Sequence, residues 1–142
     1  MRLKEKISII TGAASGFGKG IAKKFSEEGA KVILVDINKE ELEKVAKDLN
    51  QDFLYVDVSS YISMQKLSKY VLNKYENIDI IVNNAGITHL PKPLEQVSEE
   101  EFDKVFSVNS KSVFFSAKVF VPHMKKNKKG LILNVASTAG LS

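Results

Sequence analysis

Five short apolar segments alternate with four amphipathic stretches along this chain, and few folds accommodate such an alternation. The apolar segments lie near 6–11, 31–36, 53–56, 79–83 and 131–135, and the amphipathic stretches lie near 17–28, 39–49, 61–76 and 99–126. Strands that are apolar along nearly their whole length, with helices between them, indicate a parallel sheet covered on both faces. The sequence therefore predicts an α/β protein.

The order of the strands follows from the connections between them. Right-handed crossovers favour a Rossmann-type, doubly wound parallel sheet of strand order 3-2-1-4-5. In such a sheet, ligands bind outside the carboxyl ends of the strands, so a ligand would contact the loops after Thr11, Asp36, Val56 and Asn83. No internal repeat or linker interrupts the chain, and residues 1–142 are expected to form one domain.

A glycine-rich turn joins the first predicted strand to the first predicted helix. Gly12, Gly16 and Gly18 follow the strand that ends at Thr11, and the helical pattern begins near Phe17. Glycine lacks a Cβ, so a diphosphate can approach the main chain there and meet the N–H groups and positive dipole of the helix end. Turns collect glycine for other reasons too, so this triplet alone is weak evidence for a nucleotide.

A carboxylate at the end of the second predicted strand favours the nucleotide interpretation. Asp36 lies about 20 residues after the glycines, where a carboxylate can accept hydrogen bonds from both hydroxyls of an adenosine ribose. An aspartate at a strand end often only forms a turn or caps a helix, but this spacing favours the binding role. The sequence therefore predicts a dinucleotide-binding domain.

Composition argues against several other functions. The chain has no cysteine, which excludes disulfides and thiolate chemistry, and no cluster of His, Asp and Glu has the spacing of a metal site. The net charge of +4 includes a basic run at 125–129, but no aromatic residue lies within it to stack bases, so we expect no nucleic-acid partner. No segment approaches the roughly 20 apolar residues of a membrane span. We expect no membrane partner and a cytoplasmic location.

Five motifs resemble those of the short-chain dehydrogenase/reductase family and occur in the same order. Residues 11–18, Thr-Gly-Ala-Ala-Ser-Gly-Phe-Gly, are similar to the family's TGxxxGxG cofactor loop, and Asp57-Val58 is similar to its adenine-contacting pair. Asn83-Asn84-Ala85-Gly86 is similar to the NNAG segment that lines the family's cofactor crevice. Val108-Asn109-Ser110 resembles the site of the family's helix asparagine, and Asn134-Val135-Ala136-Ser137 resembles the strand that delivers its active-site serine.

The resemblance implies a function and a role for individual residues. The family transfers hydride between a nicotinamide cofactor and a carbonyl or alcohol carbon of a small-molecule substrate. The overall pattern is most similar to bacterial 3-oxoacyl-acyl-carrier-protein reductases, and after them to bacterial reductases that act on sugars or on small cyclic alcohols. Catalytic roles are implied for Ser137, which would orient the substrate oxygen, and for Asn109, which would anchor a proton-relay water. Cofactor contacts are implied for Gly12, Ser15, Gly16, Phe17, Gly18, Asp36, Asp57, Val58, Asn84, Ala85 and Gly86.

Asp36 also bears on which nicotinamide cofactor is used. A carboxylate at that site repels the 2′-phosphate of NADP. Relatives that prefer the phosphate tend to carry a basic residue at the positions of Ser15 or Ile37, and this chain has none there. We therefore expect NAD in preference to NADP.

The family's general acid/base pair, Tyr-x-x-x-Lys, is expected shortly after Ser137, but the residues from 138 to 142 include neither tyrosine nor lysine. Tyr70 and Lys74 have the same spacing, yet they come late in a predicted helix and so at the sheet edge opposite the cofactor. We interpret the chain as the amino-terminal part of an oxidoreductase, truncated after its fifth strand and inactive alone. The alternative is a non-catalytic nucleotide-binding or scaffold module.

Two apolar features predict self-association. The last predicted strand, 131–135, is expected at an open edge of the sheet. Relatives often form a subunit interface through the fourth helix, so the resemblance implies a homo-oligomer, a dimer or a tetramer. The apolar surface of that predicted helix consists of Val113, Phe114, Phe115, Val119 and Phe120.

Overall fold

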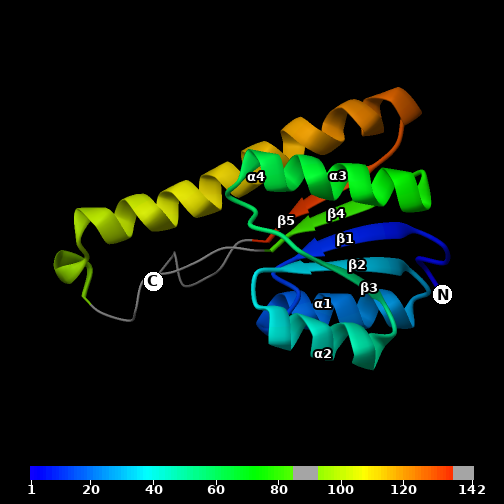
Figure 1. Ribbon diagram of the computed structural model, residues 1–142, viewed down its shortest axis with the longest axis horizontal. Coiled ribbons are helices and arrows are strands. Elements are labelled where there is room, and N and C mark those ends of the chain that lie inside the picture. The colour runs from blue at the N-terminus through cyan, green and yellow to red at the C-terminus, as the bar shows by residue number, and fades with distance from the viewer. Residues whose placement is uncertain (85–92, 136–142) are drawn as a thin grey trace.

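A computed structural model describes residues 1–84 and 93–135 and confirms the α/β class, with a parallel sheet between two layers of helices (Figure 1). The strands are β1 (Ile7–Thr11), β2 (Lys31–Asp36), β3 (Asp52–Tyr55), β4 (Ile80–Asn83) and β5 (Leu131–Asn134). The helices are α1 (Gly16–Glu27), α2 (Lys39–Leu49), α3 (Tyr61–Tyr75) and α4 (Glu99–Asn127), with a short 3-10 helix η1 (Leu94–Gln96) before α4.

The predicted strand order is confirmed, because the sheet runs β3-β2-β1-β4-β5 and every pair is parallel. β1 is central, and its Ile9 lies beside Ile33 of β2 and Ile81 of β4. Successive side chains of β1 enter different cores, since side chains alternate along a strand. Ile9 belongs to the core under α3 and α4, and Ile10 belongs to the core on the α1 and α2 side.

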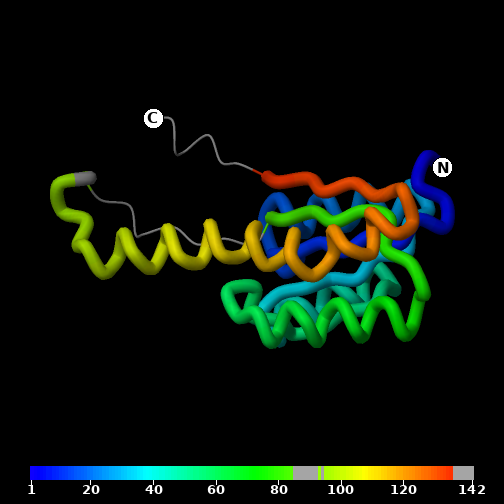
Figure 2. The backbone as a smooth tube through the Cα atoms, turned by 90° about the horizontal axis from the view of Figure 1, so that it is seen from above, coloured from blue at the N-terminus to red at the C-terminus, as the bar shows by residue number. Residues whose placement is uncertain are grey.

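Helix α4 covers the sheet with only its second half. Its buried residues begin at Ser112 and continue with Ser116, Phe120 and Met124, one turn apart along a single face. The turns before Ser112 extend past the end of the sheet in both views (Figures 1 and 2). Because α4 runs antiparallel to the strands, its projecting half lies beyond their carboxyl ends.

The prediction that five residues of α4 form an open apolar surface is wrong for three of them. Phe120 is completely buried, and Phe115 and Val119 pack against the core beneath α3 and α4. They lie on or next to the face that the 3.6-residue repeat turns toward the sheet. Val113 and Phe114 are exposed as predicted.

Strand β5 is the last strand of the sheet and pairs with β4. Leu131 and Leu133 are 57% and 45% exposed, which agrees with the predicted open edge. In the part of the chain that the structure describes, no helix has both the length and the apolar character needed to cross a membrane.

Candidate dinucleotide site

A cavity of about 550 Å³ opens at the carboxyl ends of the strands. The segments that follow β1, β2, β3 and β4 line it, as the strand order predicts. The projecting half of α4 forms a further wall. Its lining residues are Gly12, Ser15, Asp36, Ile37, Val56, Asp57, Val58, Ser59, Asn84, Lys104 and Val108.

The glycine turn uses each glycine differently. Gly12 and Gly16 have φ angles of 65° and 55°, in the left-handed region that glycine adopts without strain. Gly18 permits a close approach, because a Cβ there would lie 2.0 Å from the carbonyl oxygen of Gly12. The first turn of α1 contains no acidic side chain, so the positive end of its dipole is available to an anion.

The side chains of Thr11, in β1, and of Asn84, directly after β4, hold this turn against the neighbouring strand end. The Thr11 Oγ1 accepts a hydrogen bond from the backbone N–H of Asn84 at 3.0 Å and donates to the carbonyl of Val82 at 3.4 Å. The Asn84 Nδ2 donates to the carbonyl of Gly12 at 3.3 Å. Thr11 is 2% exposed, so these contacts hold the floor of the cavity together away from water.

The Asp36 carboxylate is held in place by the backbone. The N–H of Ala14 donates to its Oδ2 and the N–H of Asn38 donates to its Oδ1, both at 3.0 Å. A carboxylate oxygen can accept more than one hydrogen bond. Asp36 is therefore oriented by the turn after β1 and still has acceptor capacity for the hydroxyls of a ribose.

Asp57 is oriented in a similar way on the next wall. Its Oδ1 accepts from the backbone N–H of Ser59 at 3.0 Å and from the Ser59 hydroxyl at 2.6 Å. Its Oδ2 accepts no hydrogen bond from any residue within the described ranges. A ligand amino group could therefore donate to Oδ2.

The cavity gathers most of the predicted cofactor residues that can be placed. Gly12, Ser15, Asp36, Asp57, Val58 and Asn84 all line it. Three others on the first turn of α1 do not: Gly16 lines a second cavity between α1 and α2, Phe17 is 79% exposed, and Gly18 lies against Gly12. Ala85 and Gly86, and the predicted catalytic Ser137, lie outside the described residues.

Asn109, the other predicted catalytic residue, lies on the projecting half of α4 directly after Val108. Its side chain is exposed, and its backbone carbonyl accepts a hydrogen bond from the Ser112 hydroxyl at 3.0 Å. It does not line the cavity, although the neighbouring Val108 does.

Sequence reasoning missed five lining residues. Ile37, Val56 and Ser59 are immediate neighbours of predicted residues, so the loops that carry them were identified correctly. Lys104 and Val108 come from α4, on which only Asn109 was predicted to belong to the site. Their spacing of four residues places both on one helix face next to Asn109, and this is the signal that could have found them.

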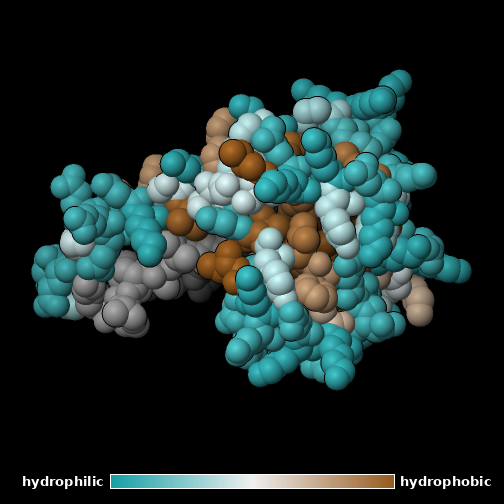
Figure 3. All heavy atoms as spheres, in the orientation of Figure 1, coloured by the Kyte–Doolittle hydropathy of each residue, from teal (hydrophilic) through white to brown (hydrophobic). Residues whose placement is uncertain are grey.

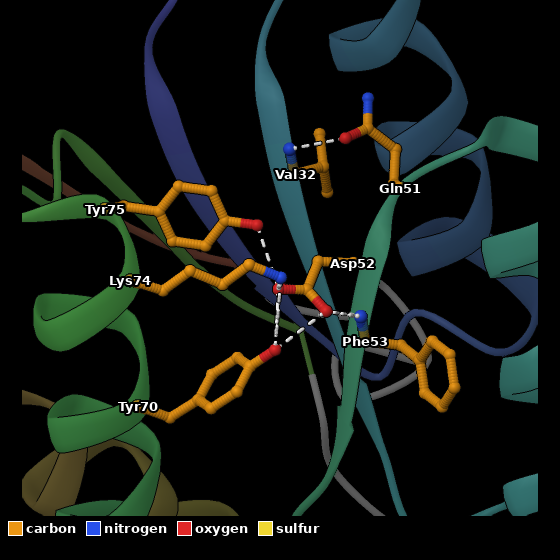
Figure 4. Close-up of polar contacts among 7 residues, drawn as sticks. All are labelled: Val32, Gln51, Asp52, Phe53, Tyr70, Lys74 and Tyr75. Carbon is orange, nitrogen blue, oxygen red and sulfur yellow. Dashed lines mark hydrogen bonds and ion pairs between the residues drawn. The ribbon is translucent and has the colours of Figure 1, made fainter.

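Tyr70 and Lys74 lie at the amino edge of the sheet, opposite the cavity as predicted, because both contact Asp52 at the start of β3 (Figure 4). The Tyr70 hydroxyl lies 3.0 and 2.9 Å from the two carboxylate oxygens of Asp52, the first residue of β3. Lys74 Nζ and the Tyr75 hydroxyl reach Asp52 Oδ2 at 2.9 and 2.8 Å. These contacts fasten the end of α3 to the amino end of β3, away from the cavity.

This cluster changes the pKa values of its members. Burial raises the pKa of Asp52, but the hydrogen bonds from Lys74, Tyr75 and Tyr70 outweigh burial, and the pKa lies below its ordinary value. Burial and the contact with Asp52 raise the pKa of Tyr75 to about 12. The ionised carboxylate and the neutral phenol are therefore the stable forms at neutral pH.

The parallel sheet, its strand order and the cavity at the carboxyl ends define a Rossmann-type α/β protein. The sequence model of the short chain dehydrogenase family matches residues 6–142, and the chain belongs to that family. The family uses nicotinamide cofactors.

The chain is similar to a 3-oxoacyl-[acyl-carrier-protein] reductase of Thermotoga maritima, with 40% identity over 99% of the chain and 59% of the relative. It is 37% identical to meso-2,3-butanediol dehydrogenase of Serratia marcescens, over 99% of the chain and 57% of the relative. A crystal structure of 3-ketoacyl-(acyl-carrier-protein) reductase from Brucella melitensis complexed with NADH superposes with a TM-score of 0.90 at 40% identity, over 96% of this chain and 59% of that one. The chain thus spans less than two thirds of the length of these relatives.

Proposed function

We propose that residues 1–142 form the dinucleotide-binding part of an NAD-dependent oxidoreductase. The observation that carries this proposal is the single cavity that joins the glycine turn to Asp36 and to Asp57-Val58. The start of α1 would hold the diphosphate, Asp36 the adenosine ribose, and Asp57 with Val58 the adenine ring. Asn84, Ala85 and Gly86 would complete the cofactor wall after β4. Bound NAD supplies the hydride acceptor, or as NADH the donor, of the reaction.

Asp36 supports NAD rather than NADP as the cofactor. Both of its oxygens are already oriented by backbone N–H groups, so the carboxylate cannot turn away without breaking these hydrogen bonds. A 2′-phosphate placed against it would bring like charges together in a partly buried site, which costs several kcal/mol at such contacts. We expect NADH to bind at least about tenfold more tightly than NADPH.

The substrate that we propose is a small carbonyl compound or its alcohol, with a 3-oxoacyl thioester as the first candidate. The similarity to the 3-oxoacyl-[acyl-carrier-protein] reductase of Thermotoga maritima supports this choice. Ser137 and Asn109 would orient the substrate oxygen and a relay water. The only Tyr-x-x-x-Lys of the sequence, Tyr70 to Lys74, is fastened at the wrong edge of the sheet, so we propose that this polypeptide alone does not reduce carbonyls. Turnover with NADH that depends on Ser137 would refute that.

We also propose that the protein self-associates through the projecting half of α4. Exposed aromatic residues lie there, and the rings of Phe102 and Phe106 stack with centroids 6.0 Å apart. Phe114 is 59% exposed on the same helix, and apolar atoms interrupt the hydrophilic surface along α4 (Figure 3). Sedimentation velocity of the wild type and of Phe106→Ser tests this: the variant should shift toward the monomer.

A titration of the 142-residue chain with NADH and NADPH tests the cofactor proposal. The chain has no tryptophan, so binding is followed through the fluorescence of the nicotinamide itself. Asp36→Asn should weaken the binding of NADH and reduce the difference in affinity between NADH and NADPH. Asp48→Asn is the matched control, because Asp48 is an acidic residue that lines the separate cavity between α1 and α2. Tighter binding of NADPH by the wild type, or an equal effect of both variants, would contradict the proposal.

A further inference from the structure

Lys104 is the one basic side chain among the described residues that line the cavity. The two acidic ones, Asp36 and Asp57, come from loops that carry the family's motifs. Lys104 belongs to no motif and comes from α4, far along the chain from the glycine turn. The family's motifs therefore do not explain why a lysine lies in the cavity wall.

The path of α4 places Lys104 at the outer rim of the cavity. Phe115 contacts Tyr61, the first residue of α3, with ring centroids 5.4 Å apart. Lys104 precedes Phe115 by about three turns, or about 16 Å along the axis. It lies one turn beyond Val108, on the same helix face, and both residues look into the cavity.

Within residues 1–84 and 93–135, no side chain or backbone group neutralises the ammonium group of Lys104. It makes no hydrogen bond or ion pair with any residue of the described ranges. Several other lysines do have acidic partners, such as Lys74 with Asp52 at 2.9 Å and Lys31 with Glu5 at 3.1 Å. A cation on the wall of a cavity, with no anionic partner among the described residues, is available to an anionic ligand.

The negative charges in the cavity wall suggest a role for this lysine. Two carboxylates in the wall oppose the entry of a dinucleotide, which carries a negative diphosphate. A single ammonium in the same cavity offsets part of that repulsion, because exposed charges act over a Debye length of about 8 Å at physiological salt. Lys104, Asp36 and Asp57 line the same cavity of about 550 Å³, so all three charges act on a ligand bound there.

We propose that Lys104 is a further cofactor-binding residue, which attracts the phosphates of the dinucleotide from the α4 side of the cavity. This inference rests on the proposed dinucleotide function. It makes α4 part of the cofactor site and assigns the lysine to charge recognition rather than to packing on the adenine ring.

Calorimetric titration of the 142-residue chain with ADP and with adenosine tests the inference. Lys104→Gln should weaken the binding of ADP about threefold to fivefold, the size expected for one exposed ion pair. Lys104→Glu should weaken ADP binding more than about tenfold. Both variants should bind adenosine as tightly as the wild type does. Added salt should reduce the ADP affinity of Lys104→Gln less than that of the wild type. Lys111→Gln is the matched control, since Lys111 is exposed on the same helix and does not line the cavity.

The outcomes separate this inference from the proposed function. If the wild type binds NADH and ADP but both Lys104 variants bind ADP as it does, the inference is wrong and the dinucleotide site stands. Equal weakening of ADP and adenosine also overturns it, because the lysine would then act by packing. If the wild type binds neither NADH nor ADP, the proposed function fails and the inference fails with it. Circular dichroism checks that each exposed-site variant remains folded.

Discussion

Replacing Gly18 by alanine tests how closely the chain packs beneath the cofactor cavity. The added Cβ would lie 2.0 Å from the Gly12 carbonyl oxygen and 2.6 Å from Asn84 Nδ2, whereas ordinary contact begins at 3.4 Å. The Gly12 oxygen belongs to the backbone and already accepts the hydrogen bond from Asn84. The clash therefore cannot be relieved by turning one flexible side chain.

The size of the effect follows from two opposing terms. Forcing a methyl group into a filled space costs about 3 kcal/mol of unfolding free energy. Alanine is a better helix former than glycine by up to about 1 kcal/mol, which offsets part of the loss. We expect Gly18→Ala to lower the free energy of unfolding by about 2 kcal/mol.

Gly20→Ala provides a matched control on the same helix. No atom of the described residues lies within 4 Å of a Cβ at Gly20, so only the helix-propensity gain of up to about 1 kcal/mol applies. The two variants should differ by about 3 kcal/mol in urea unfolding followed by circular dichroism. Gly18→Ala should also weaken NADH binding, because the turn that it displaces lines the cavity. Equal unfolding free energies for the two variants would refute the packing argument.

Two further predictions concern titrating groups outside the cavity. Asp52→Asn should lower the free energy of unfolding by about 2 kcal/mol at neutral pH. The folded-state pKa of Asp52 is depressed, so its stabilisation is present above the unfolded value of about 3.9 and is lost as the pH falls through the folded pKa. Urea unfolding should therefore show wild type and variant converging in acid, and a constant difference would contradict this. A hydrogen bond to Glu43 raises the pKa of Tyr55 to about 12. In an ultraviolet titration, Glu43→Gln should return that pKa toward the ordinary value of about 10 and leave Tyr75 unchanged.

The strands and helices could be predicted because local signals and packing agree in this chain. The apolar run 31–36 lies at the same residues in the structure, and the run near 6–11 differs from β1 by one residue. A buried parallel strand must be apolar along its length, so its limits are visible in the sequence. Strand order also followed, since right-handed crossovers leave few arrangements.

The apolar residues of α4 were harder to assign because hydrophobicity does not say which surface a residue meets. Phe114 and Phe115 are adjacent and equally apolar, but one is exposed and the other packs against the core. A turn of 100° separates neighbouring helix positions. The phase of α4 relative to the sheet decides their environments, and that phase depends on tertiary packing from Ser112 onward.

In the candidate site, too, residues next to strand ends were easier to predict than a residue placed by the packing of a distant helix. Asp36 and Asp57 could be predicted because each directly follows or ends a strand, and the topology brings strand ends together. For Lys104 the sequence offers only its spacing from Val108 and Asn109, because its place in the cavity depends on how far α4 projects beyond the sheet. A wall contributed by a helix of 29 residues is set by the packing of its other half.

The pair Tyr70 and Lys74 shows why spacing acquires chemical meaning only through topology. A helix that follows a parallel strand begins at the carboxyl edge of the sheet and returns to the amino edge. Residues late in α3 must therefore meet the start of a strand, and Asp52 is the first residue of β3. There the lysine and the phenol stabilise a carboxylate, and burial and Asp52 raise the pKa of Tyr70 further above the physiological range. A catalytic tyrosine requires the opposite, a lowered pKa beside the nicotinamide, so the same four-residue spacing serves stability at this edge of the sheet.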